Sequence, residues 1–235
     1  MNGKTVMVTG ATGNVGMGVV QAFAAAGANV ALVDLDADKI ARVINSDLGG
    51  DTSRFKGFPA NLGEANAVQT VVQDIATHFG KIDALVHTVG GYAAGDPVHA
   101  GNLAVFDKMI NLNARMVYLV CGAVARYMVE AGVRGSISIV LARAAQKGTQ
   151  NHAAYSASKA AAMRIMESMA AELKTHGIRV NGVSPSIVDT PPNREAMPNA
   201  NFDNWVKPEQ IGNLMVFLAT NEAMTGANVE ISAWS

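Results

Sequence analysis

Tyr155 and Lys159 stand four residues apart in the stretch YSASK. On a helix, side chains at this spacing lie on one face. An unperturbed phenol has a pKa of about 10, and a nearby ammonium group stabilises the phenolate and lowers that pKa. The pair therefore suits general acid–base chemistry, with Tyr155 exchanging a proton and Lys159 supplying positive charge. The same spacing also occurs by chance between two surface residues of a helix.

A second group of residues has the types needed to bind a nucleotide. Gly10, Gly13 and Gly16 follow the apolar run TVMVT and open a helical pattern. Glycines at this spacing permit a tight turn against a pyrophosphate, and the next helix offers free N–H groups. Asp34 ends the second apolar run, at the spacing of a carboxylate that binds the adenosine ribose. A helix cap is its other possible role, for which Asp36 is better placed. The carboxylate would repel a 2′-phosphate, so we expect NAD(H) in preference to NADP(H).

These residues lie within a repeating order of strand-like and helical segments. Apolar runs predict strands at 4–9, 29–34, 54–60, 83–88, 135–142, 178–184 and 228–232. The first helical pattern ends near residue 26 and the second begins near residue 36. Further helical patterns cover about 64–79, 102–131, 152–176 and 208–220. Repeated βα units predict a single-domain Rossmann-type α/β fold, with a doubly wound parallel sheet covered on both faces. Residues 185–207, rich in Pro and Asn, interrupt this order, and we expect them to form a substrate lid.

Composition and charge exclude several functions. Hydrophobic residues make up 49% of the 235 residues and charged residues 16%, which is typical of a globular chain. The net charge is −1 without a basic run, so neither nucleic acid nor a membrane surface is the expected partner. Cys121 is the single cysteine, and no Cys/His cluster has the spacing of a metal site. We expect no leader before the first strand, and no apolar run is long enough to span a bilayer. We expect a soluble cytoplasmic protein that acts on a small molecule.

Over nearly its whole length the chain resembles the short-chain dehydrogenase/reductase family. The residues that carry the resemblance are the glycine turn, Asp34, NLNA at 111–114, YSASK at 155–159 and RVNGVSPSIVDT at 179–190. The resemblance implies that Tyr155 is the catalytic acid or base and that Lys159 also holds the nicotinamide ribose. Asn113, rather than Asn111, aligns with the family's structural and proton-relay asparagine. Thr190 would bind the carboxamide of the cofactor.

The resemblance also implies a full set of contacts to the dinucleotide. The expected residues are Gly10, Thr12, Gly13, Asn14, Val15, Gly16, Asp34, Leu35, Asn61, Leu62, Val89, Gly90, Lys159, Pro185, Ile187 and Thr190. Asn14 stands where the family has the middle glycine of the turn, and HTVG at 87–90 replaces the usual NNAG. The apolar helices at 102–131 and 152–176 would form a four-helix interface, so we expect a homodimer or homotetramer.

One departure from the family narrows the function. Ala142 stands 13 residues before Tyr155, where the family has a serine that donates a hydrogen bond to the substrate oxygen. Loss of such a donor commonly costs about 10²–10³ in rate. Dihydropteridine reductases lack this serine, and the chain resembles that branch at VGGYAAG (89–95), LARAAQKGT (141–149) and DTPPNREAMPNANFDNW (189–205). A quinonoid dihydropterin spreads its charge, so the serine donor is less needed.

The resemblance thus implies an NADH-dependent reductase of a dihydropterin-like or other carbonyl or quinone acceptor. Three alternatives stay open: a cofactor-binding redox sensor with little catalysis, a reductase of an unrelated ketone or alcohol, and an epimerase-like relative, for which the chain is short. Tyr92 either stacks on a flat substrate or is a surface aromatic. His152 either touches substrate or starts the helix, and His87 is expected in the core near the cofactor. Phe202 and Trp205 either close the lid or anchor it.

Overall fold

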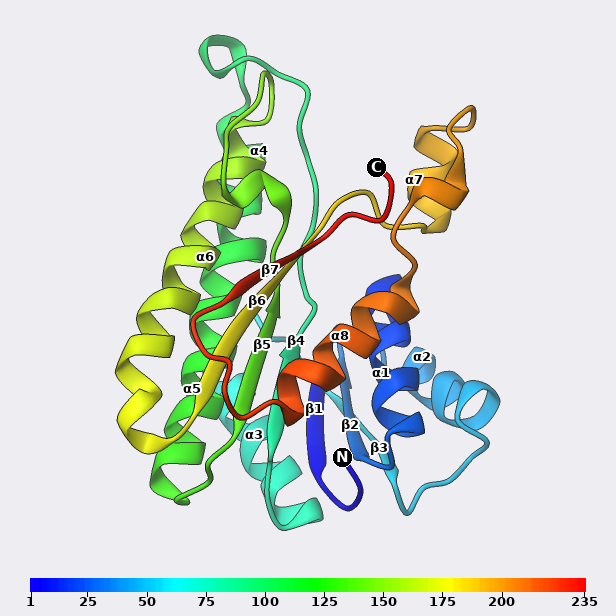
Figure 1. Cartoon of the computed structure of the whole chain (residues 1–235), viewed down its shortest axis with the longest axis vertical. Helices are drawn as coiled ribbons and strands as arrows, with labels where there is room; N and C mark the ends of the chain where they lie inside the picture. The colour runs from blue at the N-terminus through cyan, green and yellow to red at the C-terminus, as the bar shows by residue number, and fades with distance from the viewer.

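Seven strands form one sheet in the computed structural model, which describes all of residues 1–235 (Figure 1). The strands are β1 (Thr5–Thr9), β2 (Asn29–Asp34), β3 (Phe55–Pro59), β4 (Ala84–His87), β5 (Ser136–Val140), β6 (Arg179–Pro185) and β7 (Asn228–Ile231). Their order is β3-β2-β1-β4-β5-β6-β7, and every pair is parallel. The predicted Rossmann-type α/β fold is confirmed.

Helices cover both faces of the sheet (Figure 1). One face carries α1 (Asn14–Ala25), α2 (Ala37–Arg42) and α8 (Pro208–Thr220), and the other carries α3 (Ala65–Phe79), α5 (Met116–Glu130) and α6 (Ala153–Leu173). The two resulting cores contain 21 and 29 buried residues, respectively. Since strand side chains alternate between faces, both cores require apolar residues in every central strand, which explains the continuous apolar runs. None of the helices combines the length and hydropathy needed to cross a bilayer.

Close packing holds the helix that follows the glycine turn. A Cβ atom on Gly212 of α8 would lie 2.3 Å from the carbonyl oxygen of Gly18 in α1, so the two backbones touch. This contact sets the position of α1 and therefore of the turn before it. The next helix, α2, is capped by Asp36, whose carboxylate accepts a hydrogen bond from the Lys39 N–H at 3.0 Å. Asp34 is thereby left free of the capping role.

Two segments differ from the expectation. The predicted single helix over 102–131 is divided into α4 (Leu103–Ile110), a π-helical turn at Asn111–Arg115, and α5. Such turns widen a helix locally and occur often at functional sites. The stretch 185–207, which interrupts the predicted order of strands and helices, contains α7 (Pro191–Ala196) and a 3₁₀ turn at Phe202–Asn204. Thr190 caps α7 and proline occupies its first turn, which favours a helix start there.

Candidate active site

The residues expected to bind the cofactor gather at one edge of the sheet. They lie at or just after the carboxyl ends of β1 (Gly10 to Gly16), β2 (Asp34, Leu35), β3 (Asn61, Leu62), β4 (Val89, Gly90) and β6 (Pro185, Ile187, Thr190). Strand order reverses between β1 and β4. In open α/β sheets, ligands bind in the crevice that opens at such a reversal.

The glycine turn has the shape of an anion cradle. Gly10 has a φ of +67°, and a Cβ atom on Gly16 would lie 2.0 Å from the Gly10 carbonyl oxygen. Neither position therefore accepts a side chain without movement of the turn. The helix α1 begins at Asn14, and its N-cap residue Gly13 provides no side chain to occupy the first N–H groups. These donors remain directed to the crevice, which fits a pyrophosphate.

Asp34 is held against the glycine turn. One carboxylate oxygen accepts hydrogen bonds from the N–H and the hydroxyl of Thr12, at 3.0 and 2.7 Å, and the other accepts from the N–H of Leu35 at 2.8 Å. The half-buried carboxylate retains lone pairs for further donors. These contacts are compatible with the ribose hydroxyls of an adenosine, and the fixed negative charge opposes a phosphate at the same place.

Tyr155 and Lys159 lie in the first turns of α6, but no hydrogen bond joins them. The Lys159 side chain is buried and its Nζ donates to the Val140 carbonyl oxygen at 3.0 Å. Burial lowers the pKa of Lys159 to about 8. Burial, with a smaller contribution from Tyr92, raises the pKa of Tyr155 to about 12.

The expectation that Lys159 lowers the pKa of Tyr155 is wrong for this structure. The ammonium group is directed to a backbone carbonyl, and the loss of solvent around the phenol raises the pKa of Tyr155 instead. Tyr155 therefore keeps its proton at neutral pH. A protonated phenol is a proton donor.

Asn113 connects three parts of the site. Its side chain accepts a hydrogen bond from the Gly91 N–H at 2.9 Å and donates to the Gly91 carbonyl oxygen at 3.0 Å. It also donates to Ser158 Oγ at 2.9 Å, and Ser158 in turn donates to the carbonyl oxygen of Tyr155. Asn113 is buried, whereas Asn111 is exposed. Asn113 thus ties the loop after β4 to the helix that carries Tyr155. Sequence reasoning did not single out Ser158, although it lies within YSASK.

Tyr92 projects from the loop after β4 onto the start of α6. Its ring meets the Tyr155 ring edge-on, with centroids 4.9 Å apart and an interplanar angle of 76°. Its hydroxyl lies 3.0 Å from Nε2 of His152, the residue that immediately precedes α6. Tyr92 remains 64% exposed, so one face of the ring is open beside Tyr155. His152 both starts the helix and supports this ring.

Ala142 and His87 are two further buried residues at the ends of the central strands β5 and β4. Ala142 is buried just beyond the end of β5, and its carbonyl oxygen accepts a hydrogen bond from the Ala145 N–H. His87 ends β4 in the core, where its Nδ1 lies 2.9 Å from Thr9 Oγ1. Burial, and secondarily the charge of Lys159, lowers the pKa of His87 to about 3. His87 is therefore neutral at physiological pH and acts as a core residue, as predicted.

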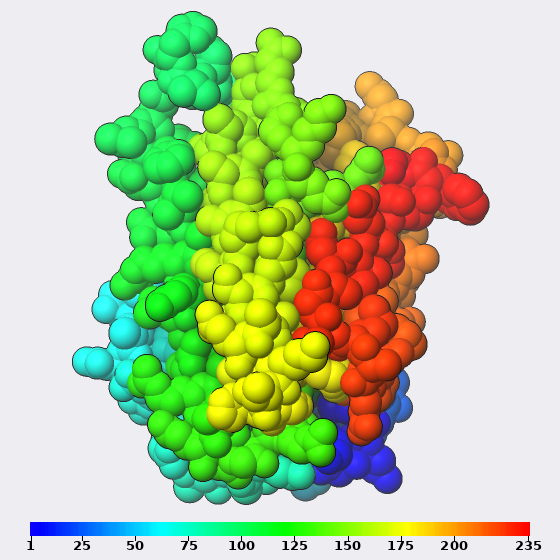
Figure 2. All heavy atoms as spheres, turned by 60° about the vertical axis from the view of Figure 1, so that its left-hand side comes forward, coloured from blue at the N-terminus to red at the C-terminus, as the bar shows by residue number.

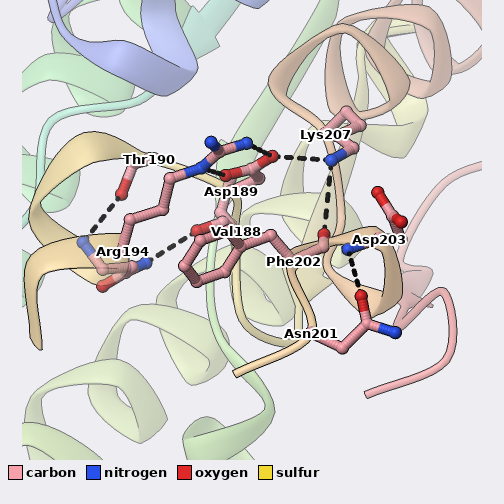
Figure 3. A network of polar contacts seen from close by, with 9 residues as sticks. Val188, Asp189, Thr190, Arg194, Asn201, Phe202, Asp203 and Lys207 are labelled. Atoms are coloured by element: carbon pink, nitrogen blue, oxygen red, sulfur yellow. Dashed lines mark hydrogen bonds and ion pairs between the residues drawn. The ribbon is translucent and has the colours of Figure 1, made fainter. Parts of the chain in front are cut away.

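A polar network anchors the segment between β6 and α8 (Figure 3). Asp189 accepts two hydrogen bonds from Arg194, at 2.5 and 2.8 Å, and one from Lys207 at 2.6 Å. These two cations, Arg194 first, hold the pKa of Asp189 well below its usual range. The Arg194 guanidinium also lies over the Phe202 ring, 4.7 Å from its centroid, and Phe202 packs on the buried Trp205. The two aromatic residues therefore anchor the segment, and Arg194 is engaged internally. Nothing in the sequence pattern identified Asp189.

The buried Lys159 provides a test of this electrostatic description. Replacing Lys159 with methionine should raise the free energy of unfolding at pH 7 by up to roughly 3 kcal/mol, the equivalent of moving a pKa from 10.5 to about 8. Between about pH 8 and pH 10.5, the native and unfolded pKa values of Lys159, the unfolded chain binds up to one more proton than the native chain. The stability of the unmodified protein therefore rises with pH over this range. The difference between the two proteins should shrink over that range in urea unfolding. Lys174→Met, at an exposed position, is the control. A difference independent of pH would contradict the prediction.

A doubly wound sheet with a glycine turn, a carboxylate at the end of its second strand and a Tyr–Lys pair at one edge is an arrangement that fits a dinucleotide-linked oxidoreductase. Residues 4–201 match the short chain dehydrogenase family, and the chain belongs to that family. Its members use NAD(P)(H) and act on small-molecule substrates.

Known relatives share nearly the whole chain. It is 34% identical to D-threitol dehydrogenase of Mycolicibacterium smegmatis over 98% of this chain and 92% of the relative. It is 30% identical to 2,3-dihydro-2,3-dihydroxybenzoate dehydrogenase of Bacillus subtilis over 81% of this chain and 72% of the relative. The crystal structure of an NAD⁺-bound xylitol dehydrogenase superposes with a TM-score of 0.89 at 26% identity, covering 99% of this chain and 98% of that one.

Proposed function

We propose that the protein is an NADH-dependent reductase of a flat, conjugated ring acceptor, such as a quinonoid dihydropterin or a related quinone or ring carbonyl. The observation that carries this proposal is the combination of Ala142 with the open aromatic face of Tyr92 beside Tyr155. A site with one proton donor suits an acceptor that spreads charge over a ring. The open ring face of Tyr92 suits a flat substrate.

The chain's own residues account for the proton transfer. When bound, NADH supplies the hydride. Tyr155, protonated because its pKa is raised to about 12, donates its proton to the heteroatom of the acceptor that gains negative charge when the hydride adds elsewhere in the conjugated system. Lys159, one helical turn away, is charged at neutral pH and would hold the nicotinamide ribose. Asn113 holds the loop at Gly91 and the first turn of α6 in one arrangement. Residues 185–207, anchored through Asp189, form the lid over this site.

The relatives leave two substrate classes to compare. The threitol and xylitol dehydrogenases are named for open-chain polyols, and the dihydroxybenzoate dehydrogenase is named for a cyclic diol. Of the two, the cyclic class is nearer to the proposed conjugated ring. An isolated carbonyl, cyclic or open-chain, would place charge on one oxygen, where Ala142 offers no donor.

The deciding experiment follows the loss of NADH absorbance with a quinonoid dihydropterin, a quinone, a cyclic diketone and an open-chain ketone, and the reverse reaction with threitol and NAD⁺. We expect the ring acceptors to have the highest kcat/KM. Turnover of threitol or the open-chain ketone alone would show an ordinary alcohol dehydrogenase. Tight NADH binding without turnover of any compound would favour the redox-sensor alternative.

Cofactor preference depends on Asp34 in this proposal. Asp34→Ala should weaken NADH binding by about 10–100-fold, the equivalent of a lost charge-assisted hydrogen bond. NADPH binding should stay constant or improve, since a repulsive charge is removed. Fluorescence titration with both cofactors measures the change, and Asp38→Ala, exposed on α2, is the control. Stronger binding of NADPH than NADH by the unmodified protein would refute the assignment.

We also propose that α5 and α6 form a two-fold interface between copies of the chain. A groove of about 620 Å³ runs between them, with Gly122 and Ala123 on its floor, and Tyr118 beside it is 68% exposed. Figure 2 shows this broad face, with α6 along its middle. Light scattering at micromolar concentration should give a dimer or tetramer. Gly122→Arg should give monomers with unchanged circular dichroism, whereas Gly148→Arg, in an exposed loop, should not. A monomeric unmodified protein would contradict the interface.

A further inference from the structure

The orientation of Tyr92 depends on a single polar contact. The backbone just before it is fixed, because the N–H and the carbonyl oxygen of Gly91 both form hydrogen bonds with the side chain of Asn113. The Tyr92 side chain itself is 64% exposed, and its hydroxyl has one hydrogen-bond partner, Nε2 of His152 at 3.0 Å. An exposed tyrosine held in this way changes its orientation when that partner is removed.

The ring of His152 is itself oriented. Its Nδ1 lies 2.7 Å from the carbonyl oxygen of Gln150. A carbonyl oxygen only accepts, so Nδ1 carries the proton. In a neutral imidazole with this tautomer Nε2 is an acceptor, and the Tyr92 hydroxyl donates to it. The backbone of His152 belongs to the start of α6, since its carbonyl oxygen accepts from the Ser156 N–H at 2.8 Å. His152 therefore links Tyr92 to the same helix that carries Tyr155.

This link fixes an aromatic wall relative to the catalytic hydroxyl. The rings of Tyr92 and Tyr155 are 4.9 Å apart between centroids and nearly perpendicular, and the rings of Tyr92 and His152 are 5.9 Å apart. The exposed ring of Tyr92 lies beside Tyr155, where a substrate that reaches the phenol can contact its open face. A flat ring gains contact from that face, whereas a flexible open-chain substrate gains little.

We propose that His152 is a positioning residue that, through Tyr92, sets the preference of the site for flat ring substrates over open-chain ones. This inference rests on the proposed function, because it takes Tyr155 as the proton donor. It adds a residue and a contact that determine substrate class.

The first test does not depend on turnover. In protein labelled with ¹⁵N-histidine, the His152 resonances should show the neutral Nδ1–H tautomer. Tyr92→Phe should shift the Nε2 signal of His152 and leave the signals of His99 unchanged. An Nε2 signal that does not respond to Tyr92→Phe would overturn the link.

The second test compares kcat and KM for a cyclic quinone and an open-chain ketone. His152→Leu and Tyr92→Phe should each raise KM for the quinone by about tenfold, with kcat within threefold and the ketone unaffected. The double variant should resemble either single one, because both changes break one contact. His152→Gln, which places an acceptor near the former Nε2, should restore KM. His99→Leu, on an exposed turn, is the control.

The kinetic outcomes distinguish a failure of the role given to His152 from a failure of the proposed reductase function. If the unmodified enzyme prefers the quinone and His152→Leu keeps that preference, the inference is wrong and the proposed function stands. If the unmodified enzyme does not reduce the quinone, both are wrong. Additive effects in the double variant would also refute the inference, since His152 and Tyr92 would then act separately.

Discussion

Tyr155→Phe should lower kcat for reduction of an activated ketone by about 10³-fold, the effect of removing a general acid. Neighbouring groups are unsuited to replace it, because Ala142 has no hydroxyl, the Lys159 ammonium is directed to the Val140 carbonyl oxygen, and the Tyr92 hydroxyl is hydrogen-bonded to His152. The phenyl ring should keep its edge contact with Tyr92, so NADH affinity should stay within about twofold. Steady-state kinetics and NADH titration measure the two quantities separately.

The matched control is Tyr118→Phe, because Tyr118 is exposed on α5 and remote from the crevice. With a quinone, the loss in Tyr155→Phe should be smaller, since solvent can protonate a product that carries spread charge. Retention of ketone reduction within tenfold would show that another group donates the proton. Tyr155 would then lose its assigned role.

Ala142→Ser should raise kcat/KM for the same activated ketone by about 10², within the range measured for a single oxyanion donor. The residue lies immediately beyond β5 with an extended backbone, φ −164° and ψ 156°, which serine adopts without strain. For a quinonoid acceptor the change should stay within a few-fold, because little charge develops on one oxygen. The informative quantity is the ratio of the two kcat/KM values before and after substitution.

Ala144→Ser, two residues along, controls for a general effect of a hydroxyl in this segment. An equal, large increase in kcat/KM for the ketone and the quinone would mean that alanine at position 142 only removes a useful donor. The proposal of a ring acceptor would then lose its main physical support, and a cofactor-binding protein with weak catalysis would become the better description.

The sequence by itself determined the architecture and two groups of residues at the crevice: the glycine turn with Asp34, and the pair of Tyr155 and Lys159. Strand alternation and helix periodicity are local properties, so the seven strands and the major helices could be predicted from residues close in the chain. The glycine turn and Asp34 could also be predicted, because the backbone requirement of a tight turn selects glycine at Gly10 and Gly16. Tyr155 and Lys159 share one helix, and their spacing alone places them within one turn of each other.

Tertiary structure alone decided how these groups behave. The pKa of Tyr155 is raised rather than lowered because packing removes solvent from the phenol and directs Lys159 to Val140. Residue spacing contains no information on burial of this kind. The contact of Tyr92 with His152 spans 60 residues, and Asn113 reaches Gly91 and Ser158 across 22 and 45. Such hydrogen bonds form only because the loop after β4, the π-helical turn and α6 pack together, and no local pattern specifies that packing.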